Sequence, residues 1–590
     1  MMQAWLHLVM LTSIWAVGVT IACAWVGGDE ETRLRRALYA WRLLPCPLLL
    51  WLMSASLAHG FKPEMAAALA VWATGWGMMH YLLRPETLPT ALGLMPALSL
   101  AGIGLGAVCD LSVAYRYPWI LRQSSVVMGQ IALCGVGVLL GLRFPTLVDQ
   151  LSRPIGIRVA LGLVAVAFLL RVAPQTAGHG WAPALLAFLL GVSIVASRTA
   201  SGRAIPVSIV QWLHKWRWAI LIASMPVVTT VVLRPDFSPV ALMASLLLFA
   251  FATLCELKAA IALFAIAAAS VTTAYMIGQP TQLVDRLHIA LSPADGVSDQ
   301  VVRCIWALSR GGPFGRGVGH FVLTDGRCAC TNEGEFRYPA TTLALTDGVF
   351  AYLAETIGVV GTLGVVLQYT LLVYWLWWEM TNAVSLWKRC WFATVMGCLA
   401  LSTLWTLGWI TNRWIVMGLA TPLLSAGYVT GTFWGILLGV SAANAVSRQS
   451  NYWNVPSPRE LIPRSSHLLL VLLPAILLIF CGEGLLRHGW YGREAAIKLV
   501  YKNRLSETFC RDALLRGWFR VSGNRIVVNE AMLRNENQPE QVEDRLRKCL
   551  DYLRLTEDGR IDVDPVRFMQ EEPSGIGRVV RLVVGESRDK

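Results

Sequence analysis

The chain of 590 residues is 55% hydrophobic and only 15% charged, with a mean hydropathy of +0.54. Soluble domains carry about a quarter charged residues, so this composition excludes an ordinary water-soluble globular protein. The net charge of +13 does not indicate nucleic-acid binding, because Lys and Arg fall mostly in short loops and form no basic stripe interleaved with aromatic residues.

Apolar runs of nearly bilayer length follow one another through most of the chain. About twenty residues of helix cross a bilayer core, and a helix satisfies its own backbone groups there. We therefore expect an all-α polytopic membrane protein. The first run has no charged n-region and no clear cleavage site, so it reads as a membrane helix and not as a signal peptide. About fourteen spans are expected, at roughly 4–26, 41–59, 65–83, 90–113, 124–142, 155–173, 181–198, 217–233, 239–257, 259–277, 348–378, 388–410, 415–445 and 466–484.

Loops rich in Arg and Lys occupy alternate connections, which predicts the orientation of the chain. Such loops stay in the cytoplasm. The N-terminus, the long segment 278–346 and the region after the last span are then expected outside the cytoplasm. The basic loops are 29–42, 143–158, 197–217, 385–389 and 447–464.

Two segments are too long to be plain connectors. Residues 278–346 lie between two spans on the outer face. Residues 485–590 have an ordinary soluble composition, with an amphipathic run at 538–555 and a strand-like run at 576–586. We expect 485–590 to form a small α+β domain outside the cytoplasm.

The outer segment contains five glycines between Gly311 and Gly319. Glycine at this density lets the backbone approach a ligand and expose N–H groups to an anion, although a flexible surface loop is the alternative. No Gly-Lys-Ser/Thr follows, so the segment is not a Walker loop.

Two carboxylates mark the start of the span that follows. Asp347 stands where polar sequence gives way to an apolar helix, as a catalytic base, a metal ligand or a helix N-cap would. Glu355 lies about 12 Å deeper at 1.5 Å per residue. An acid inside a membrane is a candidate for function or for charge pairing. We expect a structural role for Glu355, pairing with a basic or polar group across the bundle.

Four elements resemble one family in order and spacing. These are Pro235-Asp236-Phe237, the run from Arg286 through Gln300 to Ser309-Arg310-Gly311-Gly312-Pro313-Phe314-Gly315, the segment Thr346-Asp347-Gly348 with Ala354-Glu355, and Thr421-Pro422-Leu423-Leu424-Ser425-Ala426-Gly427. Together they are similar to the shape, elongation, division and sporulation (SEDS) family, the FtsW/RodA group of peptidoglycan polymerases. The chain departs from the family pattern at Gly348, Ala426 and Tyr428, as a divergent member would.

The resemblance implies an architecture in four parts. A SEDS-type core of ten helices covers 90–445 and includes the outer loop 278–346. Three extra transmembrane helices precede it at 1–89. A cytoplasmic linker and one extra transmembrane helix follow at 446–484, and the extracytoplasmic domain is 485–590.

The resemblance also implies glycosyl transfer on lipid II, the undecaprenyl-pyrophosphate-linked disaccharide peptide, at the outer face of the bacterial cytoplasmic membrane. Asp347 matches the family's essential acid and would act as general base, and a divalent cation (Mg or Mn) would be held by Asp347 and Asp236. The implied partner is a class B penicillin-binding protein, in cell shape or cell division. The expected substrate contacts are Arg286, Gln300, Ser309, Arg310, Gly311, Gly312, Asp236 and Ser425, and the expected supporting residues are Glu355, Pro422 and Gly427.

Three other functions fit parts of the pattern. A flippase or transporter for a lipid-linked precursor would also use broken helices and intramembrane acids. A non-catalytic scaffold for a penicillin-binding protein needs no catalytic acid. An O-antigen ligase or polymerase uses similar donors, but its loop motifs fit less well. The tail 485–590 has no Ser-x-x-Lys motif, so transpeptidase activity is not expected of it.

Overall fold

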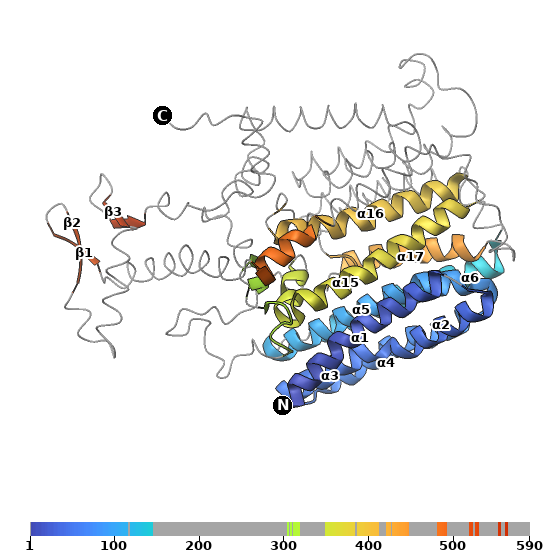
Figure 1. The fold of residues 1–590 in the computed structure, drawn as a ribbon, viewed down its shortest axis with the longest axis horizontal. Helices are drawn as coiled ribbons and strands as arrows, with labels where there is room; N and C mark the ends of the chain where they lie inside the picture. Colours follow the sequence, from blue (N-terminus) through green and yellow to red (C-terminus); the bar gives the residue numbers. More distant parts are fainter. Residues whose placement is uncertain are drawn as a thin grey trace, which may run out of the picture.

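The described part of the chain is a bundle of long apolar helices (Figure 1). Within it, six helices are long and apolar enough to cross a membrane, so the expected helical membrane architecture is confirmed for this part. The expected span 65–83 is helical as α4 (Pro63–Leu82) but is not among these six. The expected spans 415–445 and 466–484 are described only in part, and the other five expected spans lie outside the described residues. The computed structural model describes residues 2–26, 28–115, 119–145, 304–305, 307–309, 311–318, 348–383, 386–411, 413, 421–425, 428–447, 479, 481–491, 519–522, 525–529, 553–555 and 561–563.

Four helices precede the first long central helix. They are α1 (Met2–Val26), α2 (Glu30–Leu43), α3 (Pro45–His59) and α4 (Pro63–Leu82). Proline stands at the start of α3 and of α4, where its missing N–H costs nothing and its fixed φ favours the helix. Gly60 ends α3 with a φ of 81°, a conformation that suits glycine.

The basic segment 29–42 is helical, so the prediction of a loop there is wrong. Only a turn at Leu44 separates α2 from α3, and Glu30–His59 together form one candidate span. Acidic residues in the first turn of α2, a basic residue in its last turn and an ion pair of 2.5 Å between Glu31 and Arg35 all favour a helix. Charge alone therefore does not make this segment a loop.

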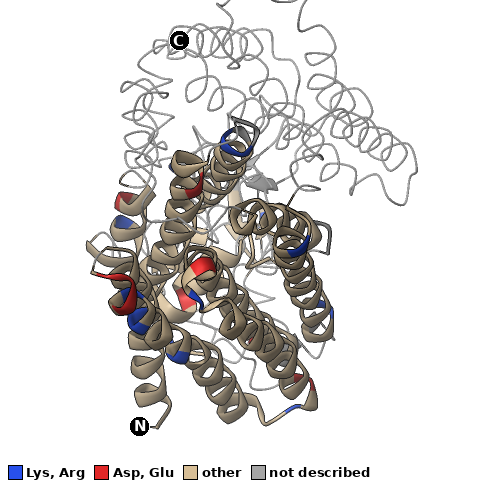
Figure 2. Ribbon diagram, turned by 90° about the vertical axis from the view of Figure 1, so that its right-hand side faces the viewer, with Lys and Arg blue, Asp and Glu red and all other residues tan. Residues whose placement is uncertain are grey.

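Five further long helices complete the described bundle. They are α5 (Leu88–Tyr115), entered through a short 3₁₀ turn η1 (Pro85–Thr87), α6 (Trp119–Arg143), α15 (Val349–Asn382), α16 (Leu386–Ile410) and α17 (Tyr428–Val446). α15 packs against α16, α5 and α1, while α6 packs against α17 and α4. Few of their residues carry charge, as Figure 2 shows for the described ribbon. The core is thus apolar side-chain packing between helices.

The expected span 415–445 is shorter than predicted. α17 begins at Tyr428, and Thr421–Ser425 is a turn in which Leu423 has a φ of 63°. Pro422 has no backbone N–H to donate in a helix, which favours this break. The turn lies against α5, where a Cβ on Gly104 would be 3.0 Å from the Leu424 carbonyl oxygen.

Two small hairpins are described in the C-terminal region. β1 (Phe519–Ser522) pairs antiparallel with β2 (Arg525–Val528), and β3 (Leu553–Leu555) pairs antiparallel with β4 (Ile561–Val563). β2 also contacts β3. The end of the amphipathic run 538–555 forms strand β3. The expected strand at 576–586 lies outside the described residues.

Candidate active site

The expected site residues divide into those that the structure describes and those that it does not. Ser309, Gly311, Gly312, Glu355, Pro422 and Ser425 are described. Outside the described residues lie Asp236, Arg286, Gln300, Arg310, Asp347 and Gly427. Asp347 is nevertheless located along the chain, because Gly348 is the N-cap of α15 and Val349 its first residue. The surroundings of the first turns of α15 therefore define the candidate site.

Helix α15 is broken inside the bundle at Gly358. This residue has φ 67° and ψ −175°, which no helix contains. A break frees backbone N–H and C=O groups, and such groups are costly to leave unpaired where water is excluded. A partner for them must come from another part of the chain.

The glycine-rich segment 311–318 supplies that partner. The amides of Val359 and Val360 donate to the carbonyl oxygens of Gly312 and Pro313 at 3.0 and 2.9 Å. In the other direction, the amides of Arg316 and Gly317 donate to the carbonyl oxygens of Glu355 and Thr356, both at 2.9 Å. Four backbone hydrogen bonds thus join the segment to both sides of the break. For residues 311–318, the alternative of a flexible surface loop does not hold.

Close backbone approach explains why glycine occupies this segment. A Cβ on Gly311 would lie 2.0 Å from the carbonyl oxygen of Ala354, far inside contact distance. Gly312, Gly315 and Gly317 have φ of 60°, 82° and 92°, in the region that side chains disfavour. The described residues just before the segment, within 304–311, are helical, and Gly312 donates to Leu308 at 3.1 Å.

The two serines expected to contact substrate, Ser309 and Ser425, each make a hydrogen bond within the fold. Ser309 is buried, and its hydroxyl donates to the carbonyl oxygen of Ile305 at 2.6 Å. The Ser425 amide donates to Thr421 at 3.1 Å within the turn. Pro422 accepts a hydrogen bond from the hydroxyl of Tyr369, so α15 holds this turn. Substrate contact by either serine stays a prediction.

Glu355 is 2% exposed and lies three residues before the break. Its carbonyl oxygen holds the Arg316 amide, and its carboxylate is close enough to Tyr352 to act on it electrostatically. The residue therefore belongs to the part of α15 that the glycine segment contacts. The pairing of its carboxylate with a basic group across the bundle stays a prediction.

Helix α1 also reaches this region. His7 Nε2 donates to the carbonyl oxygen of Phe314 at 2.6 Å, and Trp15 Nε1 donates to that of Val360 at 3.0 Å. Figure 1 shows the start of α1 and the segment 311–318 at the same end of the bundle. The N-terminal helices are thus in contact with both the glycine segment and the broken helix.

The helix at residues 481–491 also contacts the glycine segment and the broken helix α15. Residues 481–486 are α-helical and continue into a π-helical turn, η5 (Arg487–Tyr491). Trp490 lies with its ring centre 6.5 Å from that of Phe314, and a Cβ on Gly489 would be 2.3 Å from Val359. This helix therefore covers the junction between the glycine segment and α15.

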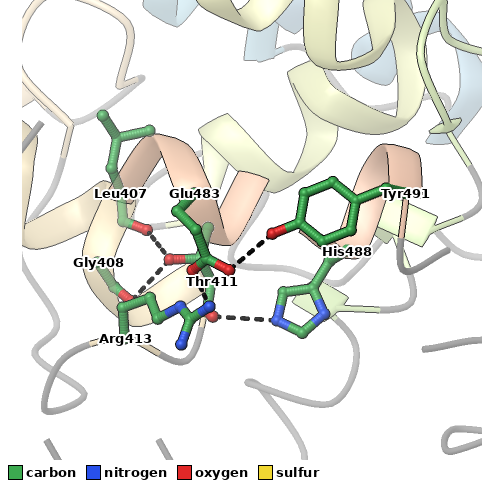
Figure 3. A network of polar contacts seen from close by, with 7 residues as sticks. All are labelled: Leu407, Gly408, Thr411, Arg413, Glu483, His488 and Tyr491. Atoms are coloured by element: carbon green, nitrogen blue, oxygen red, sulfur yellow. Dashed lines mark hydrogen bonds and ion pairs between the residues drawn. The ribbon is translucent and has the colours of Figure 1, made fainter. Parts of the chain in front are cut away.

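Polar contacts fasten this helix to the end of α16 (Figure 3). Arg413 forms an ion pair with Glu483, which also accepts a hydrogen bond from the Tyr491 hydroxyl at 2.8 Å. His488 Nε2 donates to the Thr411 carbonyl oxygen at 3.2 Å. None of these residues was singled out from the sequence. Arg413 and Thr411 lie 70 or more positions before their partners in the chain, and only Glu483 and Tyr491 are close in sequence.

A buried acid on α5 was also not singled out from the sequence. Asp110 has no exposed surface, and its two oxygens lie 2.8 Å from His59 Nε2 and 2.8 Å from the Tyr352 hydroxyl. A sequence signal existed, since Asp110 is the single charged residue of α5. Intramembrane acids of this kind are functional candidates.

The metal prediction concerns two acids that the structure does not describe, Asp236 and Asp347. Among the described residues, no group of three or more His, Cys, Asp or Glu side chains is arranged to hold a metal ion.

The comparison with protein families decides the identity of the central region. Residues 184–445 match the family model of FtsW, RodA and SpoVE, described as cell cycle proteins. Residues 184–445 therefore carry a domain of the FtsW/RodA/SpoVE (SEDS) family. This domain links the membrane-spanning protein to peptidoglycan synthesis, as the motifs predicted. The matched region contains the glycine segment, Asp347, α15, α16 and nearly all of α17.

The solved structures similar to this chain include one from work on the structural coordination of polymerization and crosslinking by a peptidoglycan synthase complex. It shares 21% sequence identity with a TM-score of 0.41, over 60% of this chain and 96% of that chain. No curated protein sequence matches this SEDS protein.

Proposed function

We propose that this SEDS protein is a peptidoglycan glycosyltransferase that polymerises lipid II at the outer face of the bacterial cytoplasmic membrane. The observation that supports the proposal is the position of Asp347. It lies inside the family domain and directly before a helix whose first turns are buried and hydrogen-bonded to the glycine segment. A carboxylate at such a fixed helix start is suited to act on one defined atom of a substrate.

In the proposed reaction, the carboxylate of Asp347 takes the proton from a sugar hydroxyl of the acceptor. The hydroxyl oxygen then forms a bond to the anomeric carbon of the donor, and the bond from that carbon to the pyrophosphate breaks. Undecaprenyl pyrophosphate leaves with the electron pair. A neutral alcohol is a weak nucleophile, so a general base is needed for this step. Arg286 and Arg310 are the proposed contacts of the leaving pyrophosphate, since arginine binds phosphate with two parallel hydrogen bonds.

The test is polymer formation from labelled lipid II by the purified full chain, alone and with a class B penicillin-binding protein, the proposed partner. We expect Asp347→Asn to lower the rate by about 10²- to 10⁴-fold, the usual contribution of a general base. Asp29→Asn is the matched control, because Asp29 is exposed and stands at the N-cap position of α2, on a different connection. Equal rates for the wild type and Asp347→Asn would contradict the proposal.

The same assay separates the other functions. Movement of the labelled headgroup across a vesicle membrane without polymer would indicate a flippase. Neither movement nor polymer, with or without the partner, would indicate a scaffold.

The proposal includes a divalent cation, Mg²⁺ or Mn²⁺, held by Asp236 and Asp347, because hard cations prefer carboxylate oxygens. Chelation with EDTA followed by addition of each cation measures this dependence. Unchanged polymer formation after chelation would contradict the role of the cation but not the role of Asp347 as general base.

A further inference from the structure

A buried network joins three helices close to the start of α15. Asp110 of α5 accepts a hydrogen bond from the Tyr352 hydroxyl and lies beside His59, which ends α3. The side chains of His59 and Asp110 are 5% and 0% exposed. His59 and Asp110 precede the matched family region, whereas Tyr352 lies inside it. The network therefore connects the N-terminal helices to the central domain.

The energetic cost of this arrangement makes packing alone a poor explanation. A carboxyl group removed from water is costly unless its oxygens are hydrogen-bonded. Here both oxygens of Asp110 have a partner at 2.8 Å. Loss of either partner would remove one of these two contacts, so the three side chains depend on one another.

The position of Tyr352 connects this network to the chemistry. Tyr352 lies in the first turns of α15, five residues after Asp347, and is fully buried. Because its hydroxyl is fixed by Asp110, the helix start has little freedom to rotate or shift. Displacement of a reacting group by 1 Å can lower a rate about 10²-fold.

We propose that His59, Asp110 and Tyr352 are positioning residues for Asp347, and that the N-terminal helices are for this reason part of the catalytic unit. This inference rests on the proposed polymerase function. Among the described residues, Glu355 of α15 lies close enough to act electrostatically on Tyr352, and Glu64 of α4 acts on Cys109, the neighbour of Asp110 in the chain.

The first experiment compares two tyrosine variants of the full chain in lipid II polymerisation. Tyr352→Phe removes only the hydroxyl that Asp110 accepts. We expect kcat to fall about tenfold with KM within about twofold of the wild type, the effect of losing one buried hydrogen bond. Tyr374→Phe is the matched control on the same helix, where the ring packs against Trp25 at 5.4 Å. It is expected to keep the wild-type kcat.

The second experiment uses variants of Asp110 and His59. Asp110→Asn and His59→Gln should each lower kcat, and the double variant should lose less than the product of the two single losses, because the residues act as one unit. His80→Gln is the control for the histidine, since His80 packs on Trp41 instead.

A third measurement does not need activity. Hydrogen–deuterium exchange of the amides of residues 348–355 should be faster in Asp110→Asn and Tyr352→Phe than in Tyr374→Phe. If the wild type makes no polymer, the proposed function fails. Faster exchange in the two variants would then still show that the network holds the start of α15. Wild-type kcat and exchange in Tyr352→Phe, or equal losses in Tyr374→Phe, would overturn the positioning role.

Discussion

Gly315 and Gly358 lie in direct backbone contact, although 43 positions separate them in the chain. A Cβ on Gly358 would be 2.2 Å from the amide nitrogen of Gly315, and a Cβ on Gly315 would be 2.5 Å from the amide nitrogen of Gly358. Both residues also have positive φ, 82° and 67°. The break in α15 and the fold of the glycine segment therefore require each other, because neither backbone could approach as closely with side chains present.

We expect Gly315→Ala and Gly358→Ala each to destabilise the protein by roughly 1 to 3 kcal/mol, through backbone strain and steric overlap. Polymerase activity should fall as well, because the segment at the start of α15 shifts. The measurement is the thermal unfolding midpoint of the purified protein in detergent. Gly77→Ala is the matched control, since a Cβ at Gly77 meets no atom within 4 Å. Equal midpoints for all three variants would refute the account of this contact.

Much of the bundle could be predicted because membrane helices leave a local pattern. The windows of about twenty apolar residues located α1, α5, α6 and α16 within a few residues. The prediction failed at α2, where Glu and Arg, both good helix formers, extend a helix beyond the apolar run. It also failed at Thr421–Ser425, where an apolar sequence forms a turn.

The site was less predictable, because its contacts join distant parts of the chain. Glycine density indicated close backbone approach, but not that the partner would be the break at Gly358. Asp110 was detectable as the single charge in an apolar run, yet its partners His59 and Tyr352 could not be derived from spacing. The ion pair of Arg413 and Glu483 is likewise a product of tertiary packing.

The Arg413–Glu483 ion pair should stabilise the attachment of the helix 481–491. The Arg413 side chain is 10% exposed and that of Glu483 is 42% exposed, so solvent screens the pair only in part. A double-mutant cycle of Arg413→Gln and Glu483→Gln should give a coupling of about 1 kcal/mol, the upper end for pairs open to solvent. The same cycle on Arg35 and Glu31, whose side chains are 71% and 68% exposed, should give about 0.3 to 0.5 kcal/mol. A coupling at Arg413 no larger than that at Arg35 would argue against a fastening role.

Helices α6 and α17 should depend on small residues where they meet. A Cβ on Gly137 would lie 2.0 Å from the Gly439 carbonyl oxygen, so these backbones touch as membrane helices with small residues do. We expect Gly137→Leu to separate the helices and to lower stability by about 1 to 3 kcal/mol, the usual cost of overpacking. Gly129→Leu on the same helix is the control, because a Cβ there meets nothing within 4 Å. The unfolding midpoint in detergent distinguishes the two variants.

The orientation of the bundle can be tested at two exposed residues, Lys62 and Glu31. Lys62 follows His59 on the connection after α3, and the contact of His59 with Asp110 and of Asp110 with Tyr352 places that connection at the same end as the start of α15. Glu31 lies in the first turn of α2, at the opposite end of the candidate span Glu30–His59 from Lys62. The positive-inside rule predicts that Lys62 faces outward and Glu31 faces the cytoplasm.

A membrane-impermeant maleimide applied to intact cells should label Lys62→Cys above the background of the thirteen native cysteines, and label Glu31→Cys only after permeabilisation. The reverse pattern would place Tyr352 and the start of α15 at the cytoplasmic face. Lipid II carries its sugars on the outer face when it is polymerised, so a base at the inner face could not reach the acceptor. That single result would therefore reject Asp347 as the base of an outer-face polymerase, whatever the stability of the variants.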